Sequence, residues 1–336
     1  MQNIKTFLNK LINIQLMSLD SIDRKLLYHL DQNCRISATQ LAKQLQIHRN
    51  VVLYRIKRLE DLKIIKGYFA EINTMKLGYT TFRLLITLSN YSSEDEEKLI
   101  KYLFNTPQLI WFFKTEGKYD VDIVYVSKNI IKFNSFIEDF HKNFNRILED
   151  EKISILTQII YYQKDYLINK KRKQVFSKKF NNEVIPIDKT DEKILNLLSK
   201  NAKINIIDLA KQTSLSINTV KARKKALEKN GIILGYRPFI DTEKTGYIYY
   251  KLYLKLKNYT SEEYAQINSF FIFKNSTIYS TKYINGEDIE IEMHLENENK
   301  FQELKNELIS KYGRIIKEIY TLKFSKEYIF RYLPTN

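Results

Sequence analysis

The sequence predicts an α+β protein built from two copies of one unit, each a small helical domain followed by a domain of strands and helices. Asp191 stands 168 positions after Asp23, and the chain matches itself at that fixed offset. Each half opens with three short stretches of helical periodicity. Each half then continues with short β-type stretches, separated by two further helical stretches. We therefore expect one duplicated unit rather than a single large domain.

The composition is that of a soluble globular protein with an excess of positive charge. Of the 336 residues, 44% are hydrophobic and 28% are charged, and only 8 Gly and 4 Pro occur. The 55 Lys and Arg residues against 39 Asp and Glu residues leave a net charge of +16. Such a charge favours a polyanionic partner, nucleic acid first and an anionic membrane surface second. The plain alternative is a Lys-rich surface without such a partner.

Cysteine content and hydropathy exclude several classes of protein. The single cysteine, Cys34, excludes an intramolecular disulfide and a Cys-rich zinc site, so we expect a reducing cytoplasm, no metal and no cofactor. No run approaches the roughly 18 apolar residues of a membrane span, so we expect no membrane insertion. Residues 1–18 carry apolar side chains near helical spacing, interrupted by Lys10. They predict an amphipathic helix that packs on the body or on a partner chain, unless Met17 is the true start.

The internal repeat keeps its register without gaps over most of a domain. It pairs Leu41-Ala42-Lys43-Gln44 with Leu209-Ala210-Lys211-Gln212, and Gly67-Tyr68 with Gly235-Tyr236. Much later, Arg146-Ile147 still meets Arg314-Ile315. Chance does not keep one register for so long, and we interpret the chain as a tandem duplication.

The helical domains are expected at residues 19–78 and 187–246. In the first, three apolar stripes predict three helices, the third through Val52, Ile56 and Leu59. In the second, the helices are expected to begin near the capping residues Asp188, Asn205 and Ser216, whereas His48 is a poorer cap for the third helix of the first domain. Extended stretches follow at residues 64–72 and 232–240, with Gly67 and Gly235 where a wing would turn. This order predicts a winged helix-turn-helix in each half.

The strand-containing domains are expected at residues 79–168 and 247–336. In the first, strands are predicted at residues 84–88, 110–114, 121–126 and 153–162, with helices at residues 94–104 and 130–146. In the second, strands are predicted at residues 250–256, 277–283, 289–294 and 316–324. The order β-α-β-β-α-β is the ferredoxin-like arrangement. Residues 169–186 form a basic linker between the halves, either simply solvated or a strap that touches phosphates.

With these residues in view, the chain resembles the Lrp/AsnC family of prokaryotic transcriptional regulators. The resemblance rests on LDSIDRKLLYHLDQNCRISATQLAKQL and RNVVLYRIKRLEDLKIIKGY in the first half. The second half repeats it as IDKTDEKILNLLSKNAKINIIDLAKQT and SINTVKARKKALEKNGIILGY. The ferredoxin-like domains resemble the effector-sensing (RAM) domain of that family, with TEGKYDVDIVYV matching its glycine-to-aspartate turn. Typical members carry one such unit, whereas this chain carries two.

The third helix of each helical domain is the candidate DNA-reading element, because such a helix enters the major groove with basic residues around it. Arg suits guanine, and Asn suits adenine. The expected DNA-binding residues are Arg49, Asn50, Tyr54, Arg55, Lys57 and Arg58 in the first half, and Asn218, Lys221, Arg223 and Lys225 in the second. Lys224 stands where Ile56 fills the helix core, so it must snorkel to solvent or shift its helix. We therefore expect the first half to supply most specificity.

The resemblance implies that the two RAM domains pair as a built-in dimer, with further assembly of chains as a homo-oligomer. It also implies a small effector, such as an amino acid, near the glycine-to-aspartate turns. The matching residues are Gly117, Tyr119 and Asp120 in the first half, and Gly286 and Asp288 in the second. Carboxylates there would pair with an ammonium group, and turn amides would hold a carboxylate. The structural alternative is that Asp120 only stabilises its turn.

The sequence thus favours a cytoplasmic, nucleoid-associated regulator that binds double-stranded DNA and is not an enzyme. One alternative is a nucleoid-like architectural protein with little sequence preference. A less favoured alternative is an enzyme like the siroheme decarboxylases, which share this architecture and use histidines. Only four histidines occur, His29, His48, His141 and His294, and two of them lie in the first helical domain.

Overall fold

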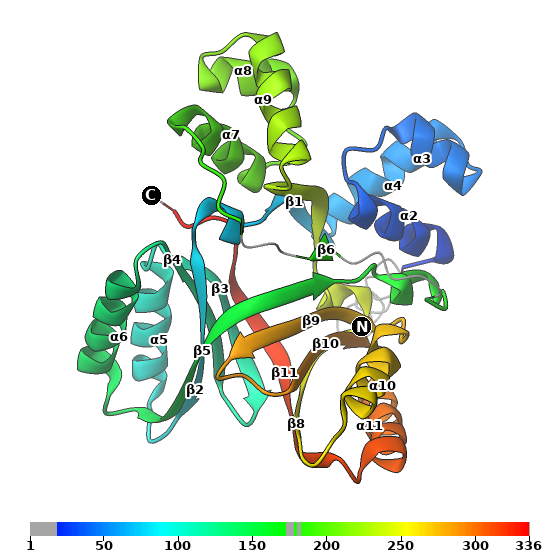
Figure 1. The fold of residues 1–336 in the computed structure, drawn as a ribbon. Helices are drawn as coiled ribbons and strands as arrows, with labels where there is room; N and C mark the ends of the chain where they lie inside the picture. The colour runs from blue at the N-terminus through cyan, green and yellow to red at the C-terminus, as the bar shows by residue number, and fades with distance from the viewer. Residues whose placement is uncertain (1–18, 173–177, 180–182, 336) are drawn as a thin grey trace, which may run out of the picture.

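A computed structural model describes residues 19–172, 178–179 and 183–335 (Figure 1). The amphipathic helix expected for residues 1–18 lies outside the described residues, as does part of the basic linker. Two groups of helices lie at one end of the molecule, and a large sheet with helices on its outside fills the other end (Figure 1). The fold is mixed α+β, as the sequence predicts.

Head 1 is the first group of helices: α2 (Ser21–Gln32), α3 (Ala38–Leu45) and α4 (Arg49–Asp61). Asp20 and Ser37 close capping boxes, in which the side chains of the cap and of the third helical residue accept each other's backbone amides. His48 caps α4 through Nδ1, which accepts from the amide of Asn50 at 3.3 Å. Each helix therefore begins where a local cap starts it.

Head 2 is the second group: α7 (Lys189–Lys200), α8 (Ile206–Thr213) and α9 (Ile217–Lys229). Their N-caps are Asp188, Asn205 and Ser216, as expected from the sequence. In each case the cap side chain accepts the amide of the third helical residue, which satisfies a group with no intrahelical partner. These helix starts are confirmed.

The strands that follow the heads pair with each other. Strand β1 (Ile65–Ile72) lies antiparallel to β7 (Ile233–Ile240) in a sheet of these two strands, with Phe69 opposite Arg237. The prediction of turns at Gly67 and Gly235 is wrong, because both glycines lie inside the strands and neither has a positive φ. In a wing hairpin, the backbone N–H and C=O groups of these residues would pair within one half. Here they pair between the two halves instead.

Each half continues in the order β-α-β-β-α-β. The first half contains β2 (Thr80–Leu88), α5 (Ser93–Phe104), β3 (Leu109–Gly117), β4 (Val121–Ser127), α6 (Ile130–Phe144) and β5 (Leu148–Tyr161). The second half contains β8 (Ile248–Leu256), α10 (Ser261–Ile272), β9 (Thr277–Ile284), β10 (Ile289–Leu295), α11 (Glu298–Tyr312) and β11 (Ile316–Phe330). Short 3₁₀ turns at Met75–Leu77 and Glu243–Thr245 lead into β2 and β8.

The strands of the two halves form one sheet. Among the described residues, nine strands follow the order β2-β4-β3-β11-β8-β10-β9-β5-β6, where β6 is the short strand Lys178–Lys179. Strand β2 also pairs with β5, so all but β6 close into a ring, which we call the barrel. Strand β3 joins β11, and β9 joins β5. Both junctions therefore pair the first half with the second inside one chain.

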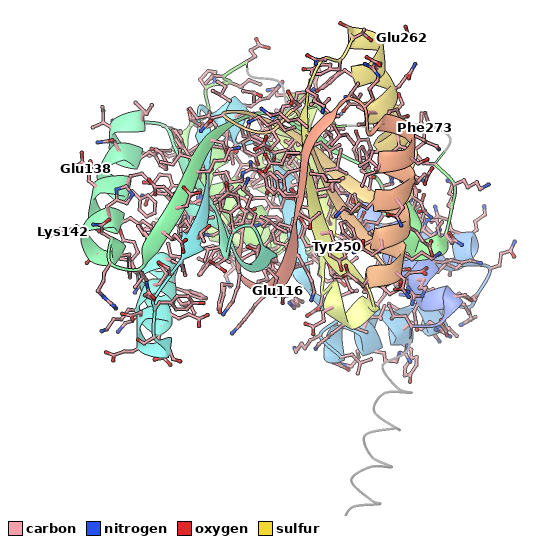
Figure 2. The ribbon with its side chains drawn as sticks, turned by 90° about the horizontal axis from the view of Figure 1, so that it is seen from below. Glu116, Glu138, Lys142, Tyr250, Glu262 and Phe273 are labelled. Carbon is pink, nitrogen blue, oxygen red and sulfur yellow. The ribbon has the colours of Figure 1, made fainter. Side chains whose placement is uncertain are left out.

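The barrel has an apolar outside and a polar inside. On β2, Phe82, Leu84 and Ile86 pack under helices α5 and α6, whereas the intervening Arg83 contacts residues from the second half. Helices α5 and α6 cover one side of the barrel, and α10 and α11 cover the other (Figures 1 and 2). Glu138 and Lys142, on the outer side of α6, point to solvent (Figure 2). Alternation along the strands thus directs charged side chains into the barrel.

Candidate nucleic-acid interface

Helix α4 is anchored in head 1 by one face. Val52 and Leu59 are fully buried in the core of the head, and Ile56 packs against that core partly buried. These three residues recur at helical spacing on one side of the helix. The opposite side therefore faces solvent, as the apolar stripe in the sequence predicts.

The exposed side of α4 carries most of the expected DNA-binding residues. Tyr54 is 68% exposed, and the side chain of Lys57 is 77% exposed, with its amine 3.8 Å from Asp61. Arg49 and Asn50 are exposed at the beginning of the helix. Bases are read mainly by side chains near the N-terminal end of such a helix. Arg49, Asn50, Tyr54 and Lys57 thus form one accessible surface, which we call the head 1 surface.

Arg55 and Arg58 instead lie against helix α2. Arg55 donates to Asp20 at 2.7 Å and to Asp23 at 2.8 Å, and Arg58 donates to Asp23 at 2.5 Å. The Asp23 side chain is fully buried, and a buried carboxylate requires a cationic partner. Both arginines therefore hold α4 onto α2. This arrangement differs from the base contacts expected from the sequence.

Helix α9 of head 2 has the same arrangement, with exposed polar residues on one side and an arginine that binds the first helix of the head. Asn218, Lys221 and Lys225 are exposed, and we call them the head 2 surface. Arg223 donates to Asp188 at 2.7 Å and to Asp191 at 3.0 Å, so it holds α9 onto α7. The sequence pattern predicts the exposed face of the helix but does not separate the arginines that hold it from the residues at its surface.

Lys224, in the apolar stripe of α9, reaches the surface. Its amine donates to Glu228 at 2.8 Å and lies 5.2 Å from the centroid of the Tyr236 ring. Helix α9 nevertheless has the same length as α4, 13 residues. The lysine therefore snorkels, which is one of the two outcomes expected from the sequence.

Backbone hydrogen bonds fix the heads relative to each other. The amide of Cys34 donates to Tyr236 O at 2.8 Å, and the amide of Ala202 donates to Tyr68 O at 2.9 Å. Arg35 also donates to Ala202 O at 2.5 Å. The loop after the first helix of each head thus binds the strand of the other head, beside the β1–β7 pairing.

The described part of the basic linker is only partly available to DNA. Lys170 and Lys171 are exposed. Arg172 is buried, donates to Asp165 at 2.8 Å, and also donates to the carbonyl oxygens of Gln163, Ile272 and Thr277. Arg172 therefore fastens the linker to the barrel rather than binding phosphates.

The glycine-to-aspartate turn of the first half lies at a barrel junction. Gly117 has φ +135°, and a Cβ there would stand 2.2 Å from Thr321 O, so only glycine fits. Tyr119 is buried, and Asp120 Oδ2 accepts from the amide of Leu88 at 2.8 Å. Asp120 thus connects its turn to the end of β2.

The second turn uses its carboxylate in the same way. Asp288 Oδ2 accepts from the amide of Leu256 at 2.6 Å. A Cβ on Gly286 would lie 2.8 Å from Glu290 Oε1. Each aspartate thus uses one carboxylate oxygen to accept a backbone amide at the end of a neighbouring strand.

A charged cluster that was not predicted from the sequence lies inside the barrel. The interior cluster consists of Arg83, Asp122, Lys251, Glu290 and Glu292. Arg83 donates to both oxygens of Glu290, at 2.5 and 2.8 Å, and Lys251 donates to Glu292 at 3.0 Å. Charged residues that alternate with apolar ones on buried strands, as Arg83 does between Phe82 and Leu84, are the signal that would have revealed it.

Burial and neighbouring charges shift the pKa values of two acids of this cluster, Asp122 and Glu290, in opposite directions. Burial raises the pKa of Asp122 to about 6, although Arg83 and Lys251 oppose the rise. Burial also disfavours the ionised form of Glu290, but attraction to Arg83 and Lys251 prevails and lowers its pKa to about 2.

The described residues contain no group of His, Cys, Asp and Glu side chains that could hold a metal ion. Among the same residues, no helix has the length and apolar character needed to cross a membrane.

Two family models match the heads. An AsnC-type helix-turn-helix domain matches residues 19–60, and a winged helix-turn-helix DNA-binding domain matches residues 187–233. Of the solved structures, the siroheme decarboxylase NirDL is similar, with a TM-score of 0.62 over 94% of both chains and 10% sequence identity. At that identity the likeness concerns the fold alone.

Curated relatives match about one unit of the chain. The HTH-type transcriptional regulator FL11 of Pyrococcus furiosus is 30% identical over 122 residues, which are 36% of this chain and 78% of the relative. The HTH-type transcriptional regulator Ptr1 of Methanocaldococcus jannaschii is 33% identical over 121 residues, which are 36% of this chain and 80% of the relative. With these relatives and an AsnC-type helix-turn-helix at its first head, the chain belongs to the Lrp/AsnC family of transcriptional regulators.

Proposed function

We propose that this chain regulates transcription as a covalent pseudo-dimer, in which both heads bind one stretch of duplex DNA. The observation that carries the proposal is the pairing of β1 with β7, which holds two helix-turn-helix heads on one frame. In this proposal residues 19–78 and 187–246 bind DNA in the cytoplasm. Residues 79–168 and 247–336 form the shared barrel, and residues 169–186 connect the halves.

The head 1 and head 2 surfaces supply the proposed contacts. Asn50 and Tyr54 approach base edges, while Arg49 and Lys57 neutralise phosphates. On head 2, Lys221 and Lys225 neutralise phosphates beside Asn218. Arg55, Arg58 and Arg223 act as positioning residues, because their guanidiniums bind the first helix of their own head.

Affinity measured against salt concentration tests this proposal. Fluorescence anisotropy with genomic fragments enriched by the protein should give a log–log slope of about −0.9 for each phosphate contacted. Lys221→Ala with Lys225→Ala should reduce that slope by about two contacts and weaken selected and random DNA alike. Lys132→Ala with Lys142→Ala, on α6 outside the heads, is the matched control. An affinity independent of salt contradicts the proposal.

The same measurement separates a specific regulator from an architectural protein. A regulator should bind its selected fragments about 10³-fold or more tightly than random DNA. Asn50→Ala with Tyr54→Ala should lower this ratio more than it lowers affinity for random DNA. Equal affinity of the unmodified protein for both kinds of DNA favours the architectural alternative.

A small effector is also part of the proposal, but not at the turns expected from the sequence. Asp120 and Asp288 each use one oxygen to accept a backbone amide there, whereas Asp122 Oδ1 inside the barrel is buried without a hydrogen-bond partner among the described residues. We therefore locate the effector inside the barrel, beside the interior cluster. Assembly of several chains is a further part of the proposal, and light scattering measures it against the 40.2 kDa of one chain.

An enzyme of the siroheme decarboxylase kind is the second candidate, favoured by the whole-chain likeness to NirDL. A cavity of about 610 Å³ between the barrel and β7 has an aromatic lining that includes Trp111 and Phe324. Its only histidine among the described residues, His294, is bound through Nδ1 to the Tyr166 hydroxyl at 2.6 Å. We propose that this protein lacks siroheme decarboxylase activity. An absorbance titration with siroheme should therefore show no saturable spectral change, and saturable binding with release of CO₂ would reverse that conclusion.

A further inference from the structure

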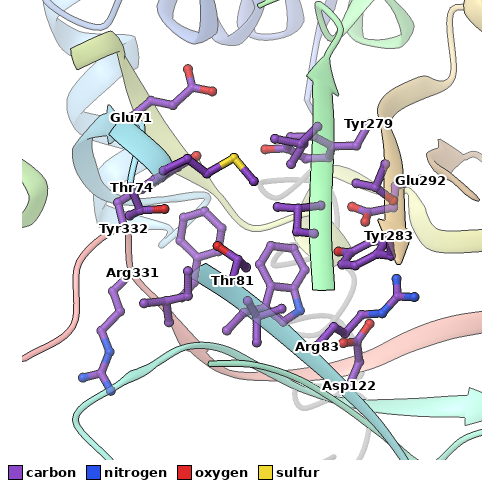
Figure 3. A pocket seen from close by; sticks show the side chains of 18 of the residues that line it. Glu71, Thr74, Thr81, Arg83, Asp122, Tyr279, Tyr283, Glu292, Arg331 and Tyr332 are labelled. Atoms are coloured by element: carbon purple, nitrogen blue, oxygen red, sulfur yellow. The ribbon is translucent and has the colours of Figure 1, made fainter. Parts of the chain in front are cut away.

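A second cavity lies inside the barrel, next to the interior cluster (Figure 3). Its volume is about 120 Å³. One water needs about 10–15 Å³ on this measure, so the cavity has room for a molecule of roughly ten non-hydrogen atoms. Tyr279, Tyr283, Thr81 and Asp122 line it (Figure 3), and so does Trp111. The cavity therefore combines aromatic walls with a polar floor.

The charges of the interior cluster do not balance, because two bases face three acids. Arg83 is engaged by Glu290, and Lys251 is engaged by Glu292. The remaining acid, Asp122, is only 3% exposed, and its Oδ1 has no hydrogen-bond partner in the described part of the chain. A buried acceptor without a donor carries its full desolvation cost. The interior cluster thus lacks one positive charge and one set of donors.

We propose that this cavity binds one small organic monocation, a primary amine with an apolar or aromatic body. Its ammonium group donates to Asp122, and the hydroxyl oxygens of Thr81 and Thr281 are available to accept its other protons. The body packs on Trp111 and Tyr279, whose ring faces attract a cation. A neutral molecule of the same shape leaves the charge of Asp122 uncompensated.

The cavity also borders the connection between the barrel and the heads. Glu71 and Thr74, at the end of β1 and just after it, line the cavity. Glu71 Oε2 accepts from Arg237 Nε of β7 at 2.8 Å. A bound amine therefore contacts the strand pair that carries both heads. An effect of the amine on DNA binding rests on the proposed function, whereas amine binding itself does not.

Three probes test the proposal: 2-phenylethylamine, 2-phenylethanol, which has nearly the same shape without the charge, and phenylalanine, which adds a carboxylate to the amine. Trp111 is the single tryptophan of the chain and lies in the cavity wall, so its fluorescence reports occupancy directly. We expect saturable quenching by the amine, with a Kd at least tenfold lower than that of the alcohol or of phenylalanine. Calorimetric titration of the full chain should give one amine per chain.

Asp122→Asn should abolish the preference for the amine over the alcohol, because it removes the charge and keeps the shape. Glu318→Gln, an exposed acid paired with Lys118, should leave that preference unchanged. The circular dichroism spectrum and melting temperature of each variant show whether it is folded. Equal affinity for amine and alcohol overturns the proposal, as does tighter binding of phenylalanine or no binding by any probe. DNA binding measured without amine tests the proposed function alone, so the two failures are distinguishable.

Discussion

Arg237 of β7 forms a buried ion pair with Asp31 at the end of α2, with Nη1 3.2 Å from Oδ2. Its Nε donates to Glu71 of β1 at 2.8 Å, so one guanidinium from the second half binds two carboxylates of the first. Asp31 also accepts from Lys164 at 3.0 Å and from the hydroxyl of Tyr161 at the end of β5. Burial opposes the ionisation of Asp31, but Lys164 and Arg237 prevail and lower its pKa. This network connects both heads with the barrel.

Arg237→Ala should therefore destabilise the whole chain. Removing the guanidinium leaves two buried carboxylates short of a partner, and breaking a buried pair in this way costs about 3–5 kcal/mol. Urea denaturation followed by circular dichroism measures the loss. Lys323→Ala, which breaks an exposed pair with Glu116, should cost less than about 1 kcal/mol. Equal effects of the two substitutions would contradict this account of the network.

The arginines of the third helices should differ in their contribution to stability. Arg55→Ala with Arg58→Ala leaves Asp23 buried without a cation, which should cost head 1 about 3–5 kcal/mol. Arg223→Ala should cost head 2 only about 1 kcal/mol, because the side chain of Asp191 is 19% exposed and can be hydrated. Amide hydrogen exchange in α2 and α7 measures each head separately. Unchanged protection of α2 in the double variant would show that these arginines do not hold the head together.

Asp122 should make stability depend on pH in a direction that a single substitution reveals. Its folded-state pKa of about 6 lies above the ordinary 3.8, so the ionised group weakens the fold at neutral pH, and this cost disappears as the pH falls from about 6 to 4. Arg83, Lys251, Glu290 and Glu292 are the charged groups that face it.

Asp122→Asn should thus be more stable than the unmodified chain at pH 7 by up to about 3 kcal/mol, and the difference should vanish near pH 4. Urea denaturation of both proteins at several pH values measures it. A difference that does not vary with pH would show that the carboxylate does not titrate in this window.

His294 should act on stability in the opposite direction. Burial lowers its pKa well below 6.5, so the folded state binds its proton less readily than the unfolded chain does. Stability should therefore fall on acidification below about pH 6.5, by up to about 1.4 kcal/mol per pH unit. His294→Gln should be less stable at pH 8, since it loses the contact with Tyr166, and should lack this dependence. Parallel pH profiles of the two proteins would contradict the assignment.

Local signals predicted most of the fold, whereas the pairing of β1 with β7 was not accessible from the sequence. Asp188, Asn205 and Ser216 predict where their helices begin, because an N-cap acts within one helical turn. Gly67 suggested a hairpin because the sequence does not show that β1 finds its partner in β7. The candidate site could also be predicted where its signals are local and could not where they are long-range. Periodicity identified α4 and its exposed face, but the ion pairs of Arg55 depend on Asp20 and Asp23, which lie more than thirty residues earlier.

The β1–β7 pairing has a consequence for the DNA sites this chain recognises. A dimer of identical subunits presents the same reading surface twice, and its sites are accordingly palindromic. Here the two surfaces differ, with Tyr54 and Leu53 on head 1 where head 2 has Ala222 and Lys221, and the strand pair fixes their order. If both heads bind one stretch of DNA as proposed, we therefore expect its site to have unlike halves and a direction. A regulator of this kind can distinguish one orientation of a promoter from the other without a second protein.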